Sequence, residues 1–192
     1  MDINDRIAER LRTLRGERGF TLDALAELSG VSRSMISLIE RGQSSPTASV
    51  LDKLAAGLDV TLAALFEGAS PDAPAPPVSR HAEQPVWQDP ASGYVRRNLS
   101  PPGHASAMQL VDVSFPAGKR VAYDSVARDD IQQQVWVIDG AIELTVGDDV
   151  WRLDAGDCLA MRLDRPIAYR NPGRKPARYL VALATVTTTR TR

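Results

Sequence analysis

The sequence predicts an α + β protein of two domains, a bundle of short helices followed by a β-sandwich or barrel. Up to residue 66, apolar residues recur three or four positions apart, as they do on the buried face of a helix. From residue 108 onward, short branched and aromatic segments follow one another with turn residues between them. Between these halves, residues 67–80 are rich in Pro and Ala and contain little to bury, which is typical of a linker.

Length and composition agree with two folded domains. The 192 residues, 43% of them hydrophobic, can form two modest cores, which we expect in residues 1–67 and 84–192 with a Pro/Ala linker over 68–83. We expect this linker to let the helical domain take variable angles relative to the second domain.

Charge and cysteine content narrow the possible functions. The formal net charge of −1 excludes a large overall positive field, so any basic surface must be local. The single cysteine, Cys158, excludes an internal disulfide and is expected to be a buried structural thiol. The chain opens on charged residues, and no apolar run approaches the ~20 residues of a membrane span, so we expect a cytoplasmic protein without membrane contact.

Five short helices are predicted in the first domain. An apolar stripe with arginines on its outer face begins the series, and it consists of Ile3, Ile7, Leu11 and Leu14. Gly30 can take the left-handed conformation that ends a helix, and Ser32 is a good N-cap for the next one. Thr47 and Thr61 are expected to cap the fourth and fifth helices.

Residues 21–42 read as two helices joined by a tight turn at Gly30, the geometry that places a helix in a DNA major groove. Ile36 and Ile39 fall on the inner face of the second helix. Its other side carries two arginines and two hydroxyls, which suit base edges and phosphates. These outward residues are Arg33, Ser34, Ser37, Leu38 and Arg41.

The run SGVSRSMIS, followed by IERG and SPT, resembles the five-helix domain of phage repressors and of the xenobiotic-response-element (XRE) class of bacterial regulators, over Ile3 to Phe66. The resemblance implies a recognition helix from Ser32 to Arg41. The implied DNA-binding residues are Arg33, Ser34, Ser37 and Leu38 at the bases, Arg41, Gln43 and Ser44 at phosphates, and Thr21 at the start of the motif. Leu22 stands where many members have a glutamine that contacts a phosphate, so that contact is not expected here.

The resemblance also suggests a structural ion pair between Arg15 and Glu40. Glu40 adjoins the inward Ile39, where an unpaired charge would be costly. The alternative is that both are solvated surface charges.

The second half is similar to the cupin family, a small jelly-roll barrel, over Gln84 to Val186. The similarity rests on the order of the turns FPAG, VWVIDG and RPIAYRNPG, with Gly140, Gly156, Pro166 and Asn171 at the motif spacings. The strands expected from the pattern are residues 108–115, 133–140, 141–146, 150–153, 158–163, 167–171 and 177–186.

Metal-binding cupins place two His and a Glu in the first motif and another His in the second, because a divalent metal needs converging donors. Here the Glu position holds Gln133 and the last His position holds Ile167. The His pair would fall on Val126 and Arg128 or on Ala127 and Asp129, and neither His81 nor His104 matches a ligand position. Asp124, Asp129 and Asp130 are more simply solvated than metal-binding, so we expect no metal and no other cofactor.

A barrel without metal still has an interior that can hold a small ligand. The residues expected to line it are Tyr123, Gln133, Val135, Met161, Ile167 and Tyr169, with Arg96 or Arg178 as the anchor of an anionic group. The alternative, that these side chains fill the core, applies most to Met161 and Ile167. Trp136 is expected to face outward, either to anchor a dimer or to pack near Trp87.

These expectations favour a transcriptional regulator rather than an enzyme. It would be a homodimer that binds a pseudo-palindromic double-stranded DNA operator, while a metal-free cupin domain senses a small molecule. Two alternatives stay open at this point: a cupin domain that only dimerises, and a cupin enzyme fused to a helix-turn-helix.

Overall fold

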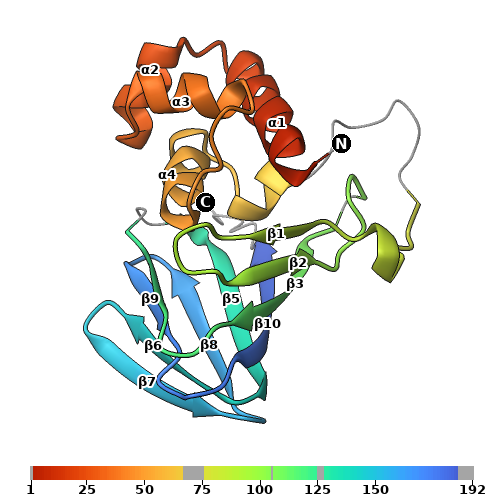
Figure 1. Cartoon of the computed structure of the whole chain (residues 1–192), viewed down its shortest axis with the longest axis vertical. Helices are drawn as coiled ribbons and strands as arrows, with labels where there is room; N and C mark the ends of the chain where they lie inside the picture. The colour runs from red at the N-terminus through yellow and green to blue at the C-terminus, as the bar shows by residue number, and fades with distance from the viewer. Residues whose placement is uncertain (1, 67–75, 105, 125–127, 186–192) are drawn as a thin grey trace, which may run out of the picture.

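The computed structural model describes residues 2–66, 76–104, 106–124 and 128–185. It shows two units, with the helices gathered at one end of two facing β-sheets (Figure 1). Residues 68–75 of the predicted linker, and Val126 and Ala127 of the alternative metal positions, lie outside the described residues.

Each helix begins at a side-chain cap that the local sequence supplies. Asp2 forms a capping box with Asp5, and Thr21, Ser32 and Thr47 each accept a hydrogen bond from the backbone N–H three residues later. The helices are α1 (Ile3–Glu17), α2 (Leu22–Ser29), α3 (Arg33–Glu40) and α4 (Ala48–Gly57).

The predicted fifth helix is a short 3₁₀ helix, η1 (Leu62–Phe66), so the described chain contains four α-helices rather than five. The Ala64 N–H donates to the Thr61 carbonyl three residues back, at 3.0 Å, and also to the Thr61 hydroxyl. A segment of five residues is too short to build a ladder of i to i+4 bonds, and the tighter turn still buries Leu65 and Phe66.

The second unit consists of two antiparallel sheets. One sheet has the order β1-β2-β3-β10-β5-β8 and the other the order β4-β9-β6-β7. In chain order, after a 3₁₀ turn η2 (His81–Glu83), the strands are β1 (Val86–Gln88), β2 (Val95–Asn98), β3 (Met108–Phe115), β4 (Arg120–Tyr123), β5 (Arg128–Asp139), β6 (Ala141–Val146), β7 (Asp149–Asp154), β8 (Cys158–Leu163), β9 (Ile167–Arg170) and β10 (Ala177–Thr185).

The expected closed barrel is instead an open jelly-roll-like sandwich. Among the described residues no ladder of hydrogen bonds joins the two sheets, which therefore keep free edges. The short strands β1, β2 and β4 were not expected from the sequence, because three or four residues with polar neighbours show no clear alternation.

Strand β5 follows the predicted alternation. Gln133, Val135 and Val137 are buried, whereas Trp136 is 47% exposed. Cys158 lies opposite Trp136 in the ladder and is also exposed, so the expectation of a buried thiol was wrong. A residue at the beginning of an edge strand takes its side from the register, which the local sequence does not reveal.

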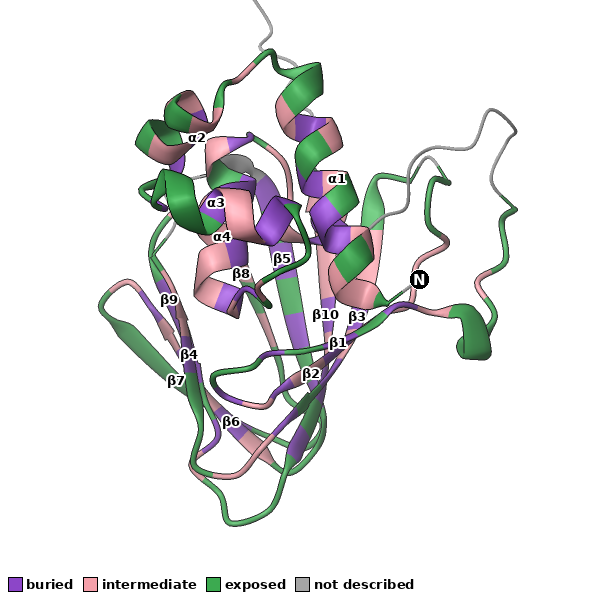
Figure 2. Ribbon diagram, turned by 45° about the horizontal axis from the view of Figure 1, so that its top comes forward, coloured by how far each residue is buried: buried purple, intermediate pink, exposed green. Residues whose placement is uncertain are grey.

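The two units pack against each other through buried contacts, and Figure 2 shows buried residues on the helices where they meet the sheets. The rings of Phe66 in η1 and Trp87 in β1 have centroids 5.6 Å apart, and both side chains are buried. The Asp89 carboxylate accepts a hydrogen bond of 2.9 Å from the Ala48 N–H. The structure therefore does not show the variable placement expected from the linker, and Trp87 is not covered by Trp136.

No helix in the described part of the chain is both long enough and apolar enough to span a lipid bilayer.

Candidate DNA-binding surface and ligand cavity

The turn between α2 and α3 has the geometry expected of a helix-turn-helix. Gly30 ends α2 with φ of 67°, in the left-handed region that favours glycine. Ser32 then starts α3 by accepting a hydrogen bond from the Met35 N–H. Leu25, Ile36 and Ile39 are almost fully buried between the helices, which fixes the angle of α3 to α2.

The outer face of α3 presents most of the expected DNA-binding residues to solvent. Arg33, Ser34, Arg41 and Gln43 are exposed, as is Thr21 at the cap of α2. Ser37, Leu38 and Ser44 are only partly exposed. Met35, which the sequence analysis did not include, is also exposed on this helix, and its sulfur accepts a hydrogen bond of 3.8 Å from the Ser44 hydroxyl.

Two of these side chains already have polar partners. The Arg33 Nε lies 3.1 Å from an Asp23 carboxylate oxygen, and both groups are well exposed. The Arg41 Nε donates a hydrogen bond of 3.0 Å to Gln43. Both arginines can exchange these weak surface contacts for a phosphate or a base edge.

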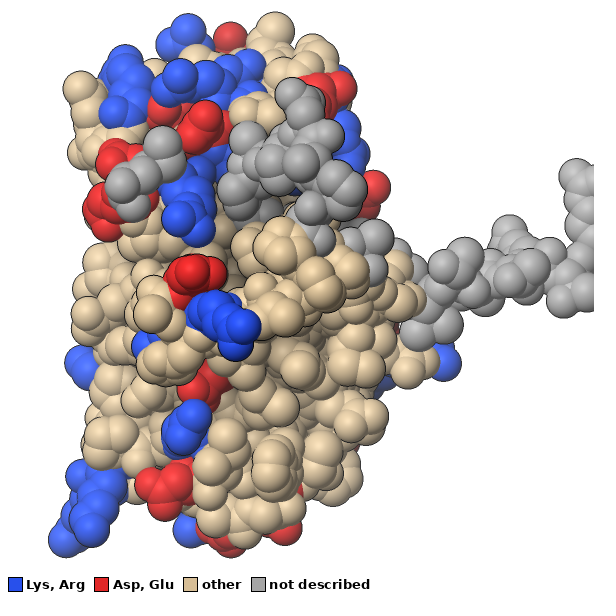
Figure 3. Space-filling model, turned by 90° about the vertical axis from the view of Figure 1, so that its right-hand side faces the viewer, with Lys and Arg blue, Asp and Glu red and all other residues tan. Residues whose placement is uncertain are grey.

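Basic side chains gather on the helical end of the molecule in the view of Figure 3, where acidic groups lie among them. The sheets below show a more neutral surface on this side. The basic groups are thus placed locally, as the near-neutral net charge requires.

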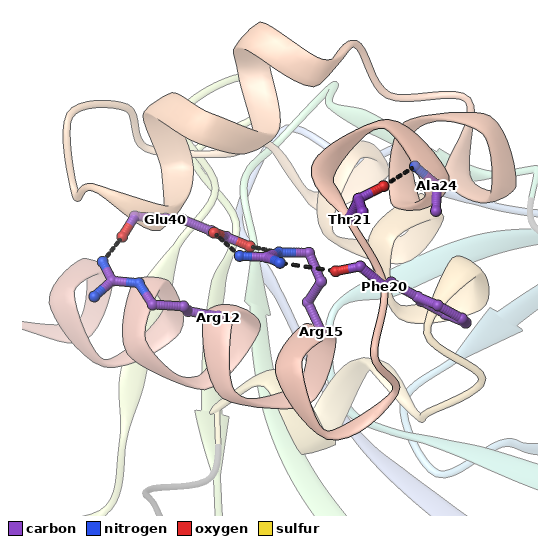
Figure 4. A network of polar contacts seen from close by, with 6 residues as sticks. All are labelled: Arg12, Arg15, Phe20, Thr21, Ala24 and Glu40. Carbon is purple, nitrogen blue, oxygen red and sulfur yellow. Dashed lines mark hydrogen bonds and ion pairs between the residues drawn. The ribbon is translucent and has the colours of Figure 1, made fainter.

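Arg15 and Glu40 form a two-pronged ion pair between α1 and α3 (Figure 4). The Arg15 Nε and Nη2 donate to the two Glu40 oxygens at 2.6 and 2.8 Å, and Nη1 donates to the Phe20 carbonyl at 2.8 Å. The Arg12 guanidinium also donates to the Glu40 main-chain carbonyl. Glu40 is buried, and the pKa of Arg15 is raised by its hydrogen bond to that carboxylate.

A cavity of about 120 Å³ lies between the two sheets, at the end covered by the helical unit. Its sheet walls are aromatic and aliphatic, with a few polar groups among them. These wall residues are Tyr94, Arg96, Val113, Tyr123, Ile131, Gln133, Leu163, Arg165, Ile167, Tyr169, Tyr179, Val181 and Leu183.

The polar groups of the cavity form two hydrogen-bonded pairs. The Gln133 amide donates to the Tyr169 hydroxyl at 2.5 Å, and the Tyr94 and Tyr123 hydroxyls are 3.0 Å apart. Burial raises the pKa of Tyr94, Tyr123 and Tyr169 above that of an ordinary tyrosine. The hydroxyls therefore stay protonated near neutral pH and can donate hydrogen bonds to a ligand.

Arg96 supplies the cationic group of the cavity. Arg96 is only 6% exposed, and its Nε donates a hydrogen bond of 3.1 Å to the side-chain oxygen of Asn98. Its Nη2 is buried and has no hydrogen-bond partner among the described residues. The guanidinium also lies over the Phe66 ring, 5.2 Å from the centroid.

Five of the pocket residues expected from the sequence lie around this cavity: Arg96, Tyr123, Gln133, Ile167 and Tyr169. Three lie elsewhere. Val135 is fully buried core, and Met161 faces the same side as Gln133 but packs on the core outside the cavity. Arg178 is exposed and forms an ion pair of 2.9 Å with Asp112.

Several wall residues were not predicted from the sequence. Tyr94 belongs to the loop before the short strand β2, which was not predicted, and Tyr179 lies on β10, whose inward side was not assigned. A Tyr179 facing inward implies an outward Arg178 by alternation, and that signal could have excluded Arg178.

The cavity does not offer the donors of a cupin metal site. Two of the family's ligand positions, Gln133 and Ile167, do line it, but an amide already bonded to Tyr169 and an alkyl group are a poor donor set. Within the described part of the chain no group of three or more His, Cys, Asp or Glu converges to hold a metal ion.

Comparisons with known proteins agree with both units. The helix-turn-helix family matches residues 11–65, and the cupin domain family matches residues 113–183. The HTH-type transcriptional regulator SutR of Escherichia coli (strain K12) is 28% identical over 173 residues, 90% of this chain and 91% of its own. The HTH-type transcriptional regulator PuuR of the same strain is 26% identical and covers 85% of this chain and 86% of its own.

Among solved structures, an HTH_3 family transcriptional regulator from Vibrio cholerae superposes with a TM-score of 0.76. It is 24% identical, and the match covers 96% of this chain and 98% of that one. The two chains therefore share a fold over both units.

Proposed function

We infer that this chain, an XRE-type helix-turn-helix transcriptional regulator with a C-terminal cupin domain, acts as a homodimer on a pseudo-palindromic operator and senses a small molecule in a metal-free cupin domain. The observation that carries the DNA-binding part is the exposed face of α3, held against α2 by the Gly30 turn. We place the DNA-binding domain at residues 1–67 and the effector and dimerisation domain at 84–192.

Dimerisation is supported by the outer face of the larger sheet. Trp136 is 47% exposed there, and Ile138, two residues along the same strand, is 36% exposed. Large apolar side chains of this kind are enriched at protein interfaces. Two-fold pairing of this face would present two α3 helices to two half-sites. Because the net charge of the chain is near zero, one copy attracts DNA weakly, and pairing would raise the affinity.

Ligand sensing is supported by the cavity between the sheets and its buried arginine, because a cupin domain used only for assembly needs neither. Enzyme activity is disfavoured by the poor metal donor set and by the positions of His81 and His104, which do not line the cavity. We also propose a cytoplasmic location, which fits a regulator that binds DNA.

Selection of bound DNA from a random pool with the full-length chain tests this function. We expect enrichment of an inverted repeat whose half-sites lie ~34 Å apart, or a multiple of that, since each α3 of the dimer enters one major groove. Enrichment of no motif contradicts DNA-specific regulation, and enrichment of a single half-site contradicts the dimer.

A further inference from the structure

The cavity between the sheets is closed on one side by the DNA-binding domain. Asp52, Ala55 and Ala56 of α4 contribute to its lining. Residues Val60, Thr61 and Leu62, at and before η1, contribute the rest of this helical wall. Any molecule that fills the cavity therefore contacts the DNA-binding domain and both sheets at the same time.

Arg96 gives the cavity a preference for negatively charged ligands. A guanidinium at this depth is costly to bury unless it is paired, and among the described residues the buried Arg96 Nη2 has no hydrogen-bond partner. Arg15 and Arg178, by contrast, each bind a carboxylate through two nitrogens. The Nη2 of Arg96 is bonded to none of the described residues and can therefore donate a hydrogen bond to an anion.

Arg96 also touches the DNA-binding domain. Its guanidinium lies over the ring of Phe66, the last residue of η1, and Phe66 packs on Trp87. An anion bound to Arg96 changes the charge that this ring faces and the position of the guanidinium above it. A ligand in the cavity therefore affects the contact between the domains at Phe66 and Trp87.

The volume of the cavity and the residues that line it limit the kinds of ligand that it can hold. The cavity volume of about 120 Å³ is close to that of an engineered cavity of ~150 Å³ that binds benzene. Apart from the arginines, the sheet walls are aliphatic or carry neutral hydroxyl and amide groups. Of the two arginines in the lining, Arg165 pairs with Asp164, so Arg96 supplies one positive charge, which suits a monoanion better than a dianion such as phosphate.

We propose that the cavity is the binding site of a small monocarboxylate with a short apolar body, anchored by Arg96 and covered by α4 and η1, so that the ligand joins the two domains. This proposal rests on the proposed sensing function and specifies its ligand class and its route to the DNA-binding domain. The ligand acts by favouring one placement of the helical domain over others, and linkage requires DNA to change ligand affinity by the same factor.

The first test is thermal unfolding of the full chain with acetate, isobutyrate and benzoate, each compared with its neutral amide. At ~100 times its dissociation constant, a binding carboxylate should raise the melting temperature by roughly 5–10 °C, and its amide should not. Arg96→Gln should weaken this carboxylate at least ~10-fold by titration calorimetry, because a charged hydrogen bond is lost. Arg178→Gln, on the outer surface, should bind like the wild type.

The site is refuted if no carboxylate of the series binds, if the amides bind equally well, or if the Arg96 variant retains full affinity. Should Arg96→Gln fail to fold, Ala56→Trp tests the same site from the helical side. Ala56 is exposed at the edge of the cavity, so the indole should block the cavity without disturbing the core. Leu28→Trp, on an exposed position of α2, is its control, and equal carboxylate binding by both variants refutes the helical wall.

The second test measures operator affinity, on DNA selected from the random pool, with and without the binding carboxylate. A change in affinity that disappears in Arg96→Gln supports the coupling, and unchanged affinity with bound carboxylate overturns it. Carboxylate binding without any selected DNA refutes the proposed function and leaves the site intact. Selected DNA without carboxylate binding refutes the site and leaves the function intact.

Discussion

The buried carboxylate of Asp89, in the sheet unit, accepts a hydrogen bond from the backbone N–H of Ala48, the first residue of helix α4 in the DNA-binding unit. Its second oxygen accepts hydrogen bonds from the N–H and hydroxyl of Ser92, which hold the side chain in place. An anion at a helix N-terminus also interacts favourably with the helix dipole. One domain thus completes the helix cap of the other, alongside Thr47.

We expect Asp89→Ala to destabilise the chain by ~2 kcal/mol, since it removes a helix cap and leaves buried N–H groups without acceptors. The measurement is urea unfolding followed by circular dichroism. Asp154→Ala is the control, because this carboxylate is exposed and its ion pair with Arg152 lies on the surface. Equal stability of the two variants would show that the cap contributes nothing.

Arg15→Ala should lower the free energy of unfolding by ~3 kcal/mol, because it leaves Glu40 buried without its partner. Arg18→Ala should change it by less than ~1 kcal/mol, since the Arg18 ion pair with Asp59 is 3.9 Å long and its hydrogen bond to the Asp59 carbonyl is exposed. Urea unfolding of both variants checks the difference. A melting temperature of Arg15→Ala equal to that of the wild type would contradict a structural role for the pair.

Arg33→Ala should weaken binding to the selected DNA by ~1–3 kcal/mol and relax the preference at one base pair, as expected for a base contact. Equal loss on all sequences would instead assign Arg33 to a phosphate. Because Arg33 must leave Asp23 to reach DNA, Asp23→Asn should bind more tightly than the wild type in low salt. Binding titrations over several salt concentrations measure both effects.

Trp136→Ser should weaken the proposed dimer at least ~10-fold, because an aromatic side chain at the centre of an interface often carries much of the binding energy. Trp151→Ser is the matched control, as Trp151 is 49% exposed on β7 in the other sheet. Analytical ultracentrifugation over a range of concentrations gives the association constant. A change confined to the Trp151 variant would move the interface to the smaller sheet.

The buried tyrosines predict a loss of stability at alkaline pH. Burial raises the pKa of Tyr94, Tyr123, Tyr169 and Tyr179 above the ordinary value of 10.0. As the pH rises, unfolded chains release these protons before folded chains do. The contribution of the tyrosines to the free energy of unfolding is therefore fully present below pH ~10, and it falls as the pH rises toward the folded pKa. Each tyrosine contributes a slope of ~1.4 kcal/mol per pH unit in this window.

Tyr179→Phe keeps a ring beside Phe115 and Tyr169 but has no proton to release. Urea unfolding between pH 9 and 11.5 should therefore show a slope that is smaller by about one proton in this variant. Identical slopes would mean that Tyr179 ionises equally in both states.

Local signals predicted the helical unit well. Gly30, Ser32 and Thr47 cap helix ends through hydrogen bonds to residues three or four positions away. Their roles as caps therefore follow from the sequence alone. The cupin resemblance implied an inward Gln133, and alternation along β5 then predicted that Trp136 faces outward, as it does.

Features that depend on distant segments were not predicted. The helical wall of the cavity arises where α4 meets the sheets, and nothing in the local pattern of Ala55 or Leu62 indicates a ligand site. The wrong expectation for Cys158 came from an unknown strand register, and the wrong expectation for Arg178 came from the unassigned faces of β10.

The helix cap shared between the two units limits how far either unit can be exchanged for that of a related protein. A hybrid that joins these sheets to a foreign helical domain would need a backbone N–H in the place of Ala48 to meet Asp89, and an aromatic ring in the place of Phe66 to meet Trp87. Such hybrids should fold stably only when the foreign helical domain supplies both the N–H group and the aromatic ring. Recombination at the Pro/Ala segment alone would therefore separate Asp89 from Ala48 and Trp87 from Phe66.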